Sequence, residues 1–167
     1  MKIDANDLHY GAALKQIADD PSFKSINADR GGGNKSRCSF RINTDVGVYI
    51  RSGAEPKTRF KHYVFNFKQD NLREIAALAS RCPKTFIVLV CLKNAEICML
   101  HHQKLLDLIE LRRREFGGDE EQYNIQVTIP KAQSMRVYMN KPGSKKLIVG
   151  KRPITVPRNA FPKRIFA

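Results

Sequence analysis

The residues of this sequence best suited to chemistry are one aspartate and one glutamate–lysine pair. Glu55 follows Asp45 by ten residues, and Lys57 stands two positions beyond Glu55. Carboxylates hold hard cations such as Mg²⁺, and a nearby lysine helps to orient or activate the attacking water. These residue types predict metal-dependent hydrolysis of a phosphodiester bond, with Asp45 and Glu55 as metal ligands and Lys57 as the residue that assists the water.

Each of these three residues also fits a role without chemistry. Asp45 suits a turn beside Thr44, and Pro56 favours a solvated loop for Glu55 and Lys57, because proline cannot donate to a strand ladder. The sequence therefore leaves open whether the two carboxylates meet at a metal ion or lie apart in turns.

The positive charge of the chain is large and unevenly spread. The formal net charge is +14, and residues 122–167 hold 10 Lys and Arg but no Asp or Glu, whereas residues 1–121 hold 20 Lys and Arg with all 16 acids. Such a field favours polyanions, because neutralised phosphates release condensed counterions. A solvated basic surface that aids solubility is the simpler alternative.

Basic and aromatic residues on the expected strands and loops are predicted to contact nucleic acid, with double-stranded DNA as the expected partner. The cations expected to position phosphates are Lys35, Arg37, Arg51, Arg59, Lys61, Arg136, Lys141, Lys145 and Lys146. Tyr138 is the aromatic residue best placed to stack on a base, because it belongs to a basic strand; cross-strand packing is its alternative role. A homodimer is left open.

Cysteine spacing and apolar runs argue against several other classes. The four cysteines form no CxxC pair, and no histidine lies at finger spacing from a cysteine pair, so a zinc site is not expected. The longest apolar run, residues 86–92, is far shorter than the roughly 20 residues that span a bilayer. The N-terminus shows no apolar signal region. The expected location is cytoplasmic, or nuclear in a host with a nucleus, with no membrane partner.

Apolar periodicity predicts an α+β fold, a mixed α/β arrangement in which about three helices flank a central mixed β-sheet. The expected helices are a first helix capped by Asn6 or Asp7 and running to about Asp19, then Asn71–Arg81 and His102–Phe116. The expected strands are Ser39–Asn43, Val46–Arg51, His62–Phe67, Thr85–Leu92, Glu96–Leu100, Tyr123–Ile129, Met135–Met139, and either Leu147–Val149 or Ile154–Val156. One domain, 1–167, is expected, with 157–167 as an extended basic tail that docks through its aromatic residues.

The order of these elements over about residues 5–110, together with Asp45 and the Glu55-x-Lys57 spacing, resembles the PD-(D/E)xK nuclease superfamily. The resemblance implies a restriction-endonuclease-like sandwich and a Mg²⁺-dependent deoxyribonuclease. In that family the glutamate and lysine of the motif usually lie on a strand, whereas Pro56 favours a loop here. A second alignment places Tyr49-Ile50-Arg51 on that strand. The motif would then be degenerate, and the domain would bind DNA without cutting it.

Two functions of different classes follow. The first is a DNA-binding protein with a nuclease-like fold, in which catalysis by Asp45, Glu55 and Lys57 is left open. The alternative is a non-catalytic binding or regulatory module, in which the basic C-terminal third of the chain docks on RNA or on an acidic protein.

Overall fold

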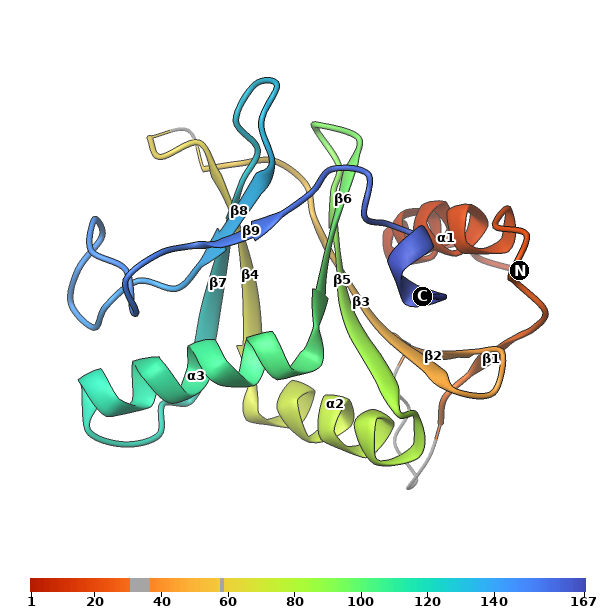
Figure 1. The fold of residues 1–167 in the computed structure, drawn as a ribbon, viewed down its shortest axis with the longest axis horizontal. Coiled ribbons are helices and arrows are strands. Elements are labelled where there is room, and N and C mark those ends of the chain that lie inside the picture. The colour runs from red at the N-terminus through yellow and green to blue at the C-terminus, as the bar shows by residue number, and fades with distance from the viewer. Residues whose placement is uncertain (31–36, 58) are drawn as a thin grey trace.

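The strands of this protein form two sheets that meet at an angle (Figure 1). The computed structural model describes residues 1–30, 37–57 and 59–167. The five-stranded sheet has the order β1-β2-β3-β5-β6, and the four-stranded sheet has the order β4-β7-β8-β9. The first sheet contains β1 (Ile26–Ala28), β2 (Ser39–Ile42), β3 (Val46–Gly53), β5 (Lys84–Cys91) and β6 (Glu96–His101). The second contains β4 (His62–Lys68), β7 (Gln122–Thr128), β8 (Met135–Tyr138) and β9 (Ile154–Val156).

Strand direction distinguishes the two sheets. β3 and β5 pair in parallel, with Val46 opposite Lys84 and Gly53 opposite Cys91, and the chain between them includes β4 and a helix. Every pair in the four-stranded sheet is antiparallel. Parallel strands need such a long crossover. Here the crossover includes β4, which pairs with β7 in the other sheet.

Three α-helices within the described residues cover the five-stranded sheet and its junction with β4. They are α1 (Ala5–Ala18), α2 (Gln69–Arg81) and α3 (His102–Phe116). α1 packs on β3 and β5, on the side away from β4 and β7 (Figure 1). α2 packs on β3 and β4, and α3 packs on β5 and β6. No helix in the described part of the chain has the length and apolar character needed to cross a membrane.

One glycine allows α2 to approach the five-stranded sheet closely. A Cβ at Gly47 would lie 2.8 Å from Leu78 Cγ on α2 and 2.9 Å from Thr85 Oγ1 on β5. Such distances are shorter than carbon–carbon contacts allow, so a side chain here would push the helix and the sheet apart.

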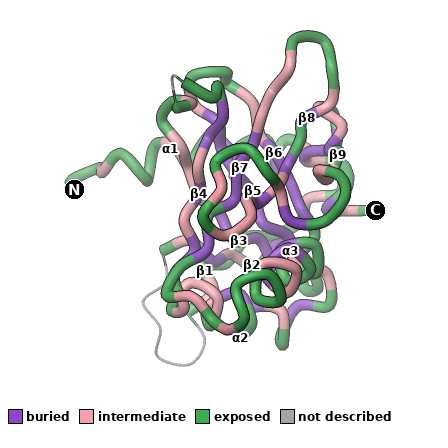
Figure 2. Tube along the Cα trace, turned by 90° about the vertical axis from the view of Figure 1, so that its left-hand side faces the viewer, coloured by how far each residue is buried: buried purple, intermediate pink, exposed green. Residues whose placement is uncertain are grey.

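The C-terminal residues turn back onto the five-stranded sheet. They end in a short 3-10 helix, η2 (Lys163–Ile165), and Phe161 and Ile165 are buried in the hydrophobic core. Figure 2, which looks at the molecule from the side of the four-stranded sheet, shows buried segments along the strands and exposed segments in the surrounding loops.

The α+β fold class expected from the sequence is confirmed, and three details differ. The strands divide into two sheets rather than one. The helix starts differ: α1 is capped by Asp4, in a capping box with Asp7, rather than by Asn6 or Asp7. Asn71, where the second helix was expected to begin, is the third residue of α2, and its side chain accepts a hydrogen bond from the Lys68 N–H. β1 was not expected, because its three residues are all exposed and show no alternation.

Candidate functional site

Asp45 and Glu55 lie at opposite ends of β3. Asp45 belongs to the turn that precedes the strand, and Glu55 lies two residues beyond its end. Eight strand residues span roughly 25 Å, at about 3.3 Å per residue, which is several times the reach of one cation. The metal site expected from these two carboxylates is therefore not assembled, and Lys57 has no carboxylate pair to assist. Among the described residues, no three His, Cys, Asp or Glu side chains gather closely enough to hold a metal ion.

Two of the cations expected to contact phosphates, Arg51 and Arg37, have partners within the protein. The Arg51 guanidinium donates to the Asn66 carbonyl oxygen at 3.0 Å and lies over the Phe67 ring, so it links the two sheets. Arg37, which precedes β2, forms an ion pair with Asp4 at 3.3 Å. Lys35 lies outside the described residues.

The four-stranded sheet has one buried face and one open face. On β4, Tyr63, Phe65 and Phe67 are buried, and Val64 and Asn66 alternate with them on the opposite face. This opposite face, here called the outer face, comprises His62, Val64, Asn66, Asn124, Gln126, Thr128, Arg136 and Tyr138, as the register of β4, β7 and β8 requires.

A row of side-chain amides crosses this outer face. The Asn66 amide nitrogen donates to the Asn124 side-chain oxygen at 2.8 Å. The Gln126 amide is satisfied when its nitrogen faces the carbonyl oxygens of Asn124 and Tyr138, at 3.2 and 3.1 Å. Amides both donate and accept hydrogen bonds, so the row offers both kinds of partner to a ligand.

An aromatic cavity opens at the beginning of β4. Its volume is about 440 Å³, and its lining residues are Lys57, Arg59, Phe60, His62, Val64, Asn140 and Lys145. The Phe60 and His62 rings are parallel within 6°, with centroids 5.6 Å apart. The Arg59 guanidinium lies 5.4 Å from the centre of the Phe60 ring, a distance typical of a cation–π contact.

The His62 imidazole forms the inner wall of this aromatic cavity in its neutral form. Burial lowers its pKa below the ordinary value of 6.5, and the nearby Lys57 ammonium lowers the pKa further. The Tyr138 hydroxyl lies 3.2 Å from His62 Nδ1, and burial raises the pKa of Tyr138, so this hydroxyl stays protonated and can donate to the imidazole.

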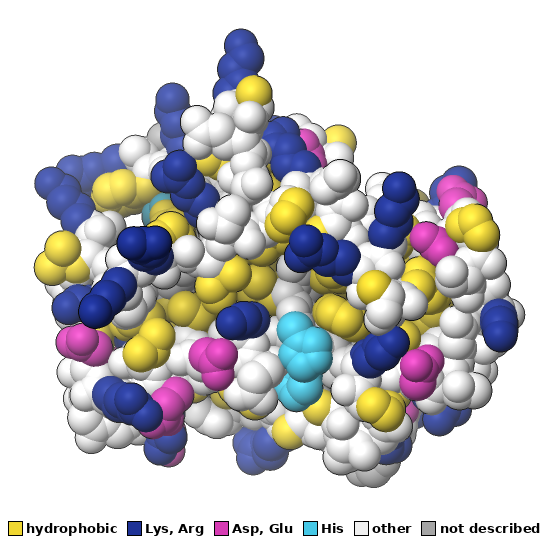
Figure 3. Space-filling view, viewed as in Figure 1, with side chains coloured by type: hydrophobic (Ala, Val, Ile, Leu, Met, Phe, Trp, Pro, Cys, Tyr) yellow, Lys and Arg dark blue, Asp and Glu magenta, His cyan; other side chains and the backbone are white. Residues whose placement is uncertain are grey.

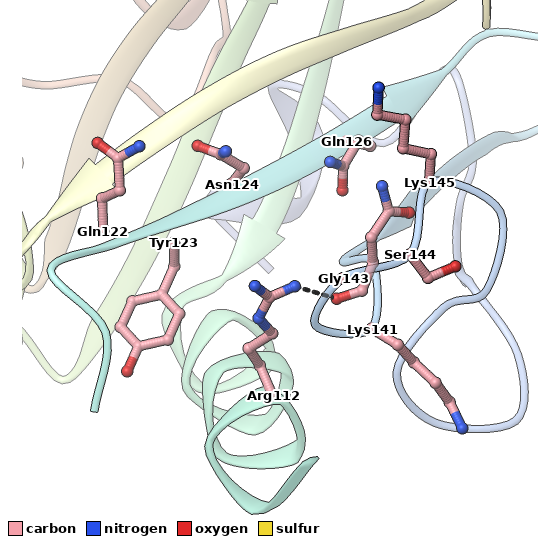
Figure 4. Close-up of a pocket in the computed structure, with 10 residues that line it drawn as sticks. Arg112, Gln122, Tyr123, Asn124, Gln126, Lys141, Gly143, Ser144 and Lys145 are labelled. Carbon is pink, nitrogen blue, oxygen red and sulfur yellow. Dashed lines mark hydrogen bonds between the residues drawn. The ribbon is translucent and has the colours of Figure 1, made fainter. Parts of the chain in front are cut away.

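A second, amide cavity of about 330 Å³ adjoins the first, because Asn140 and Lys145 line both. Its other lining residues are Arg112, Gln122, Tyr123, Asn124, Gln126, Lys141, Gly143 and Ser144. Figure 4 shows β7 on one side of this cavity, the loop of residues 140–146 on another, and Arg112 reaching in from α3.

Arg112 fixes the loop that separates the two cavities. Its Nε and Nη2 donate to both Glu120 carboxylate oxygens at 2.6 and 2.7 Å. Its Nη1 donates to the Asn140 carbonyl oxygen at 2.6 Å, the hydrogen bond drawn in Figure 4. The bidentate pair orients the guanidinium, and the third bond then ties the loop to α3.

Both cavities are rich in cations and contain no carboxylate in their linings. β4, β7, β8 and β9 contain no Asp or Glu at all. Lys57, Arg59 and Lys145 form no ion pair within the described part of the chain, and the lysine on the amide side, Lys141, lies 3.5 Å from Glu115. Figure 3 shows Lys and Arg side chains gathered at its upper left, over the loops that flank the four-stranded sheet.

Four residues predicted from the sequence therefore lie together here. Arg59, Lys145 and Tyr138 were expected to contact nucleic acid, and Lys57 was expected to assist the water. Lys61, Arg136 and Lys146 are exposed nearby in the same strands and loops. The residues of the two cavities that were not among the predicted site residues include Phe60, Asn140 and Arg112. The alternation along β4 placed His62 and Val64 opposite Phe65, but nothing in the sequence indicated which loop covers them.

Comparison of the chain with protein-family models, with curated proteins and with solved structures finds no match.

Proposed function

We propose that this protein binds nucleic acid through the outer face of the four-stranded sheet. The observation that supports the proposal is the pair of adjoining cavities, which combine unpaired cations, aromatic rings and amides with no carboxylate. Cations neutralise phosphates and release counterions, and amides and rings contact bases. The proposed function is binding rather than cleavage, because the two carboxylates expected to hold Mg²⁺ lie at opposite ends of β3.

Charge complementarity favours nucleic acid over other partners. The aromatic cavity has three cationic side chains in its lining, those of Lys57, Arg59 and Lys145, together with apolar and aromatic residues. A phosphodiester chain brings charge and flat apolar rings at regular spacing, whereas an acidic peptide brings charge without a ring at each repeat.

The test compares two triple variants with equal loss of charge. The site variant is Lys57→Ala/Arg59→Ala/Lys145→Ala, and the control is Lys2→Ala/Lys15→Ala/Arg73→Ala, whose exposed residues precede β1 or lie on α2. Binding of labelled 15-mer DNA and RNA, single- and double-stranded, is measured by fluorescence anisotropy over a salt series. We expect the site variant to weaken binding at least about tenfold and to reduce the salt slope by about 2, since each single-strand phosphate contact contributes about 0.7.

Three outcomes would overturn the proposal. The first is that the wild-type protein fails to bind any of the oligonucleotides at low salt. The second is that both triple variants weaken binding equally, which would show a diffuse charge effect without a site. The third is that polyglutamate of matched length binds as tightly as the oligonucleotides, which would identify an acidic protein as the better class of partner.

A further inference from the structure

The aromatic cavity contains a large aromatic ring, that of Phe60, which lies at the surface although a buried position would be more favourable for it. Phe60 is 36% exposed, yet its ring is held parallel to the buried His62 ring and under the Arg59 guanidinium. The exposed part of this ring offers apolar surface to solvent beside the guanidinium. Bases stack on such surfaces, and an adjacent guanidinium adds a cation–π contribution.

The polar groups of this cavity are placed to contact a base edge and its phosphates. The Asn140 side-chain amide takes part in no hydrogen bond with the described residues, although its backbone carbonyl is held by Arg112. It therefore has a donor and an acceptor available. Lys57 and Lys145 line the same cavity as this amide. The Val64 side chain adds an apolar contact.

The size of the cavity and the exposed part of its ring favour an unpaired base. The cavity is open to solvent, and its volume of about 440 Å³ lies within the range of small-molecule sites. Bases inside a duplex are stacked on one another, so their faces are not available to a side chain, whereas bases of a single strand can be splayed onto aromatic residues.

We infer that the aromatic cavity is a binding pocket for one unpaired base of single-stranded nucleic acid. The base stacks on Phe60, its edge meets Asn140, and Lys57, Arg59 and Lys145 hold the flanking phosphates. The inference rests on the proposed function. It replaces the double-stranded DNA expected from the sequence with single-stranded nucleic acid as the partner.

Phe60→Trp provides a direct probe, because the chain contains no tryptophan. The variant carries one indole, at the proposed stacking position. We expect oligo(dT) to quench its fluorescence, and an abasic chain of the same length and charge to leave it unchanged. The matched control is Leu8→Trp, which places the indole at an exposed position on α1, behind the five-stranded sheet. Oligo(dT) should not quench the control.

Phe60→Leu tests the energetic contribution of the ring while it keeps an apolar side chain. We expect this variant to bind oligo(dT) about 5- to 150-fold more weakly, the range observed when one stacking residue is removed. Its affinity for the abasic chain should not change, and its melting temperature checks that the fold is intact. Wild-type protein should also prefer the single strand to a duplex of equal length.

The outcomes separate this inference from the proposed function. If wild-type protein binds the abasic chain or the duplex as tightly as oligo(dT), while the charge-removing triple variant weakens all of them, the base pocket is wrong and the nucleic-acid surface stands. Equal quenching in Phe60→Trp and Leu8→Trp would also overturn the base pocket. If wild-type protein binds no oligonucleotide, both proposals fall.

Discussion

The two sheets of this protein differ in how many of their faces are covered. β3 and β5 carry α1 on one side and α2 with the four-stranded sheet on the other, and residues 46–50 and 85–91 are all buried. β4 and β7 have one fully covered face. On the other face Val64 and Asn66 are half-buried and Asn124 is exposed, although His62 and Gln126 are buried there too. The five-stranded sheet is thus the interior of the molecule, and the four-stranded sheet supplies a face that a ligand can reach.

The charges divide in the same way. Around the five-stranded sheet and the helices, cations have acidic partners, as in Arg81–Asp29, Arg73–Asp70 and Arg113–Asp119. The strands of the four-stranded sheet contain no acid, and the cations at their ends retain their field. Residues 122–167, which include β7, β8 and β9, hold 10 Lys and Arg and no acid, so they carry +10 of the formal net charge of +14.

The largest expected effect is on stability and contrasts the two sheets directly. Leu89→Ala in β5 removes a fully buried side chain and should lower the free energy of unfolding by about 2–5 kcal/mol. Asn124→Ala on the outer face loses the hydrogen bond with Asn66 and should cost no more than about 0.5–1.5 kcal/mol. Urea denaturation measures both. Equal costs would mean that the outer face is part of the core and is not free to bind.

A smaller effect is expected where α3 meets the four-stranded sheet. Arg112→Met leaves Glu120 without its partner and frees the loop of residues 140–146, so we expect a loss of about 1.5–3 kcal/mol, the usual value for hydrogen bonds to charged groups. Hydrogen exchange of the loop amides should become faster in this variant.

The neighbouring arginine supplies the control for this change. Arg113→Met breaks pairs with Glu110 and Asp119 that are exposed to solvent and screened by it, so the loss of stability should be clearly smaller than for Arg112→Met. In Arg112→Met/Glu120→Gln no unpaired carboxylate is left, so part of the lost stability should return. If Arg112→Met and Arg113→Met cost the same and the loop exchange is unchanged, then Arg112 does not fix the loop.

Local patterns predicted most elements of this fold because their causes are local. The alternation in residues 62–67 located β4, and the apolar residues Leu105, Leu108 and Ile109, which are buried, located α3. The division into two sheets was not predictable in this way. β4 follows β3 in the chain but pairs with β7, more than fifty residues later, and no short-range pattern encodes that choice.

The candidate site was predictable only in its charges. Arg59 and Lys145 were expected as phosphate contacts and Lys57 as the lysine that assists the water, whereas the cavity they form with Phe60 depends on the pairing of β4, β7 and β8. The structure does not bring Asp45 and Glu55 together, for a reason already present in the sequence. Residues 46–51 were themselves expected to be a strand, and a strand holds the residues at its ends apart.

The smallest expected effect concerns histidines, one from each sheet. His62 on β4 and His101 on β6 both have a pKa lowered from 6.5, first by burial and then by a neighbour, which is Lys57 for His62 and His102 for His101. Below pH 6.5 the unfolded chain takes up protons that the folded chain resists. The stability that each group contributes is thus complete above pH 6.5 and is lost as pH falls toward the folded pKa.

Lys57→Met separates the two histidines. It removes the cation that opposes protonation of His62 and leaves His101 and its neighbour unchanged, so only the His62 imidazole should titrate at a higher pH in NMR spectra. Bound oligonucleotide should move the His62 pKa in the same direction, because phosphates favour the imidazolium. An equal shift at His101 in either experiment would point to a long-range effect of net charge. A His62 that titrates at or above 6.5 in the free protein would mean that the imidazole is solvated, and the aromatic cavity would then lack its inner wall.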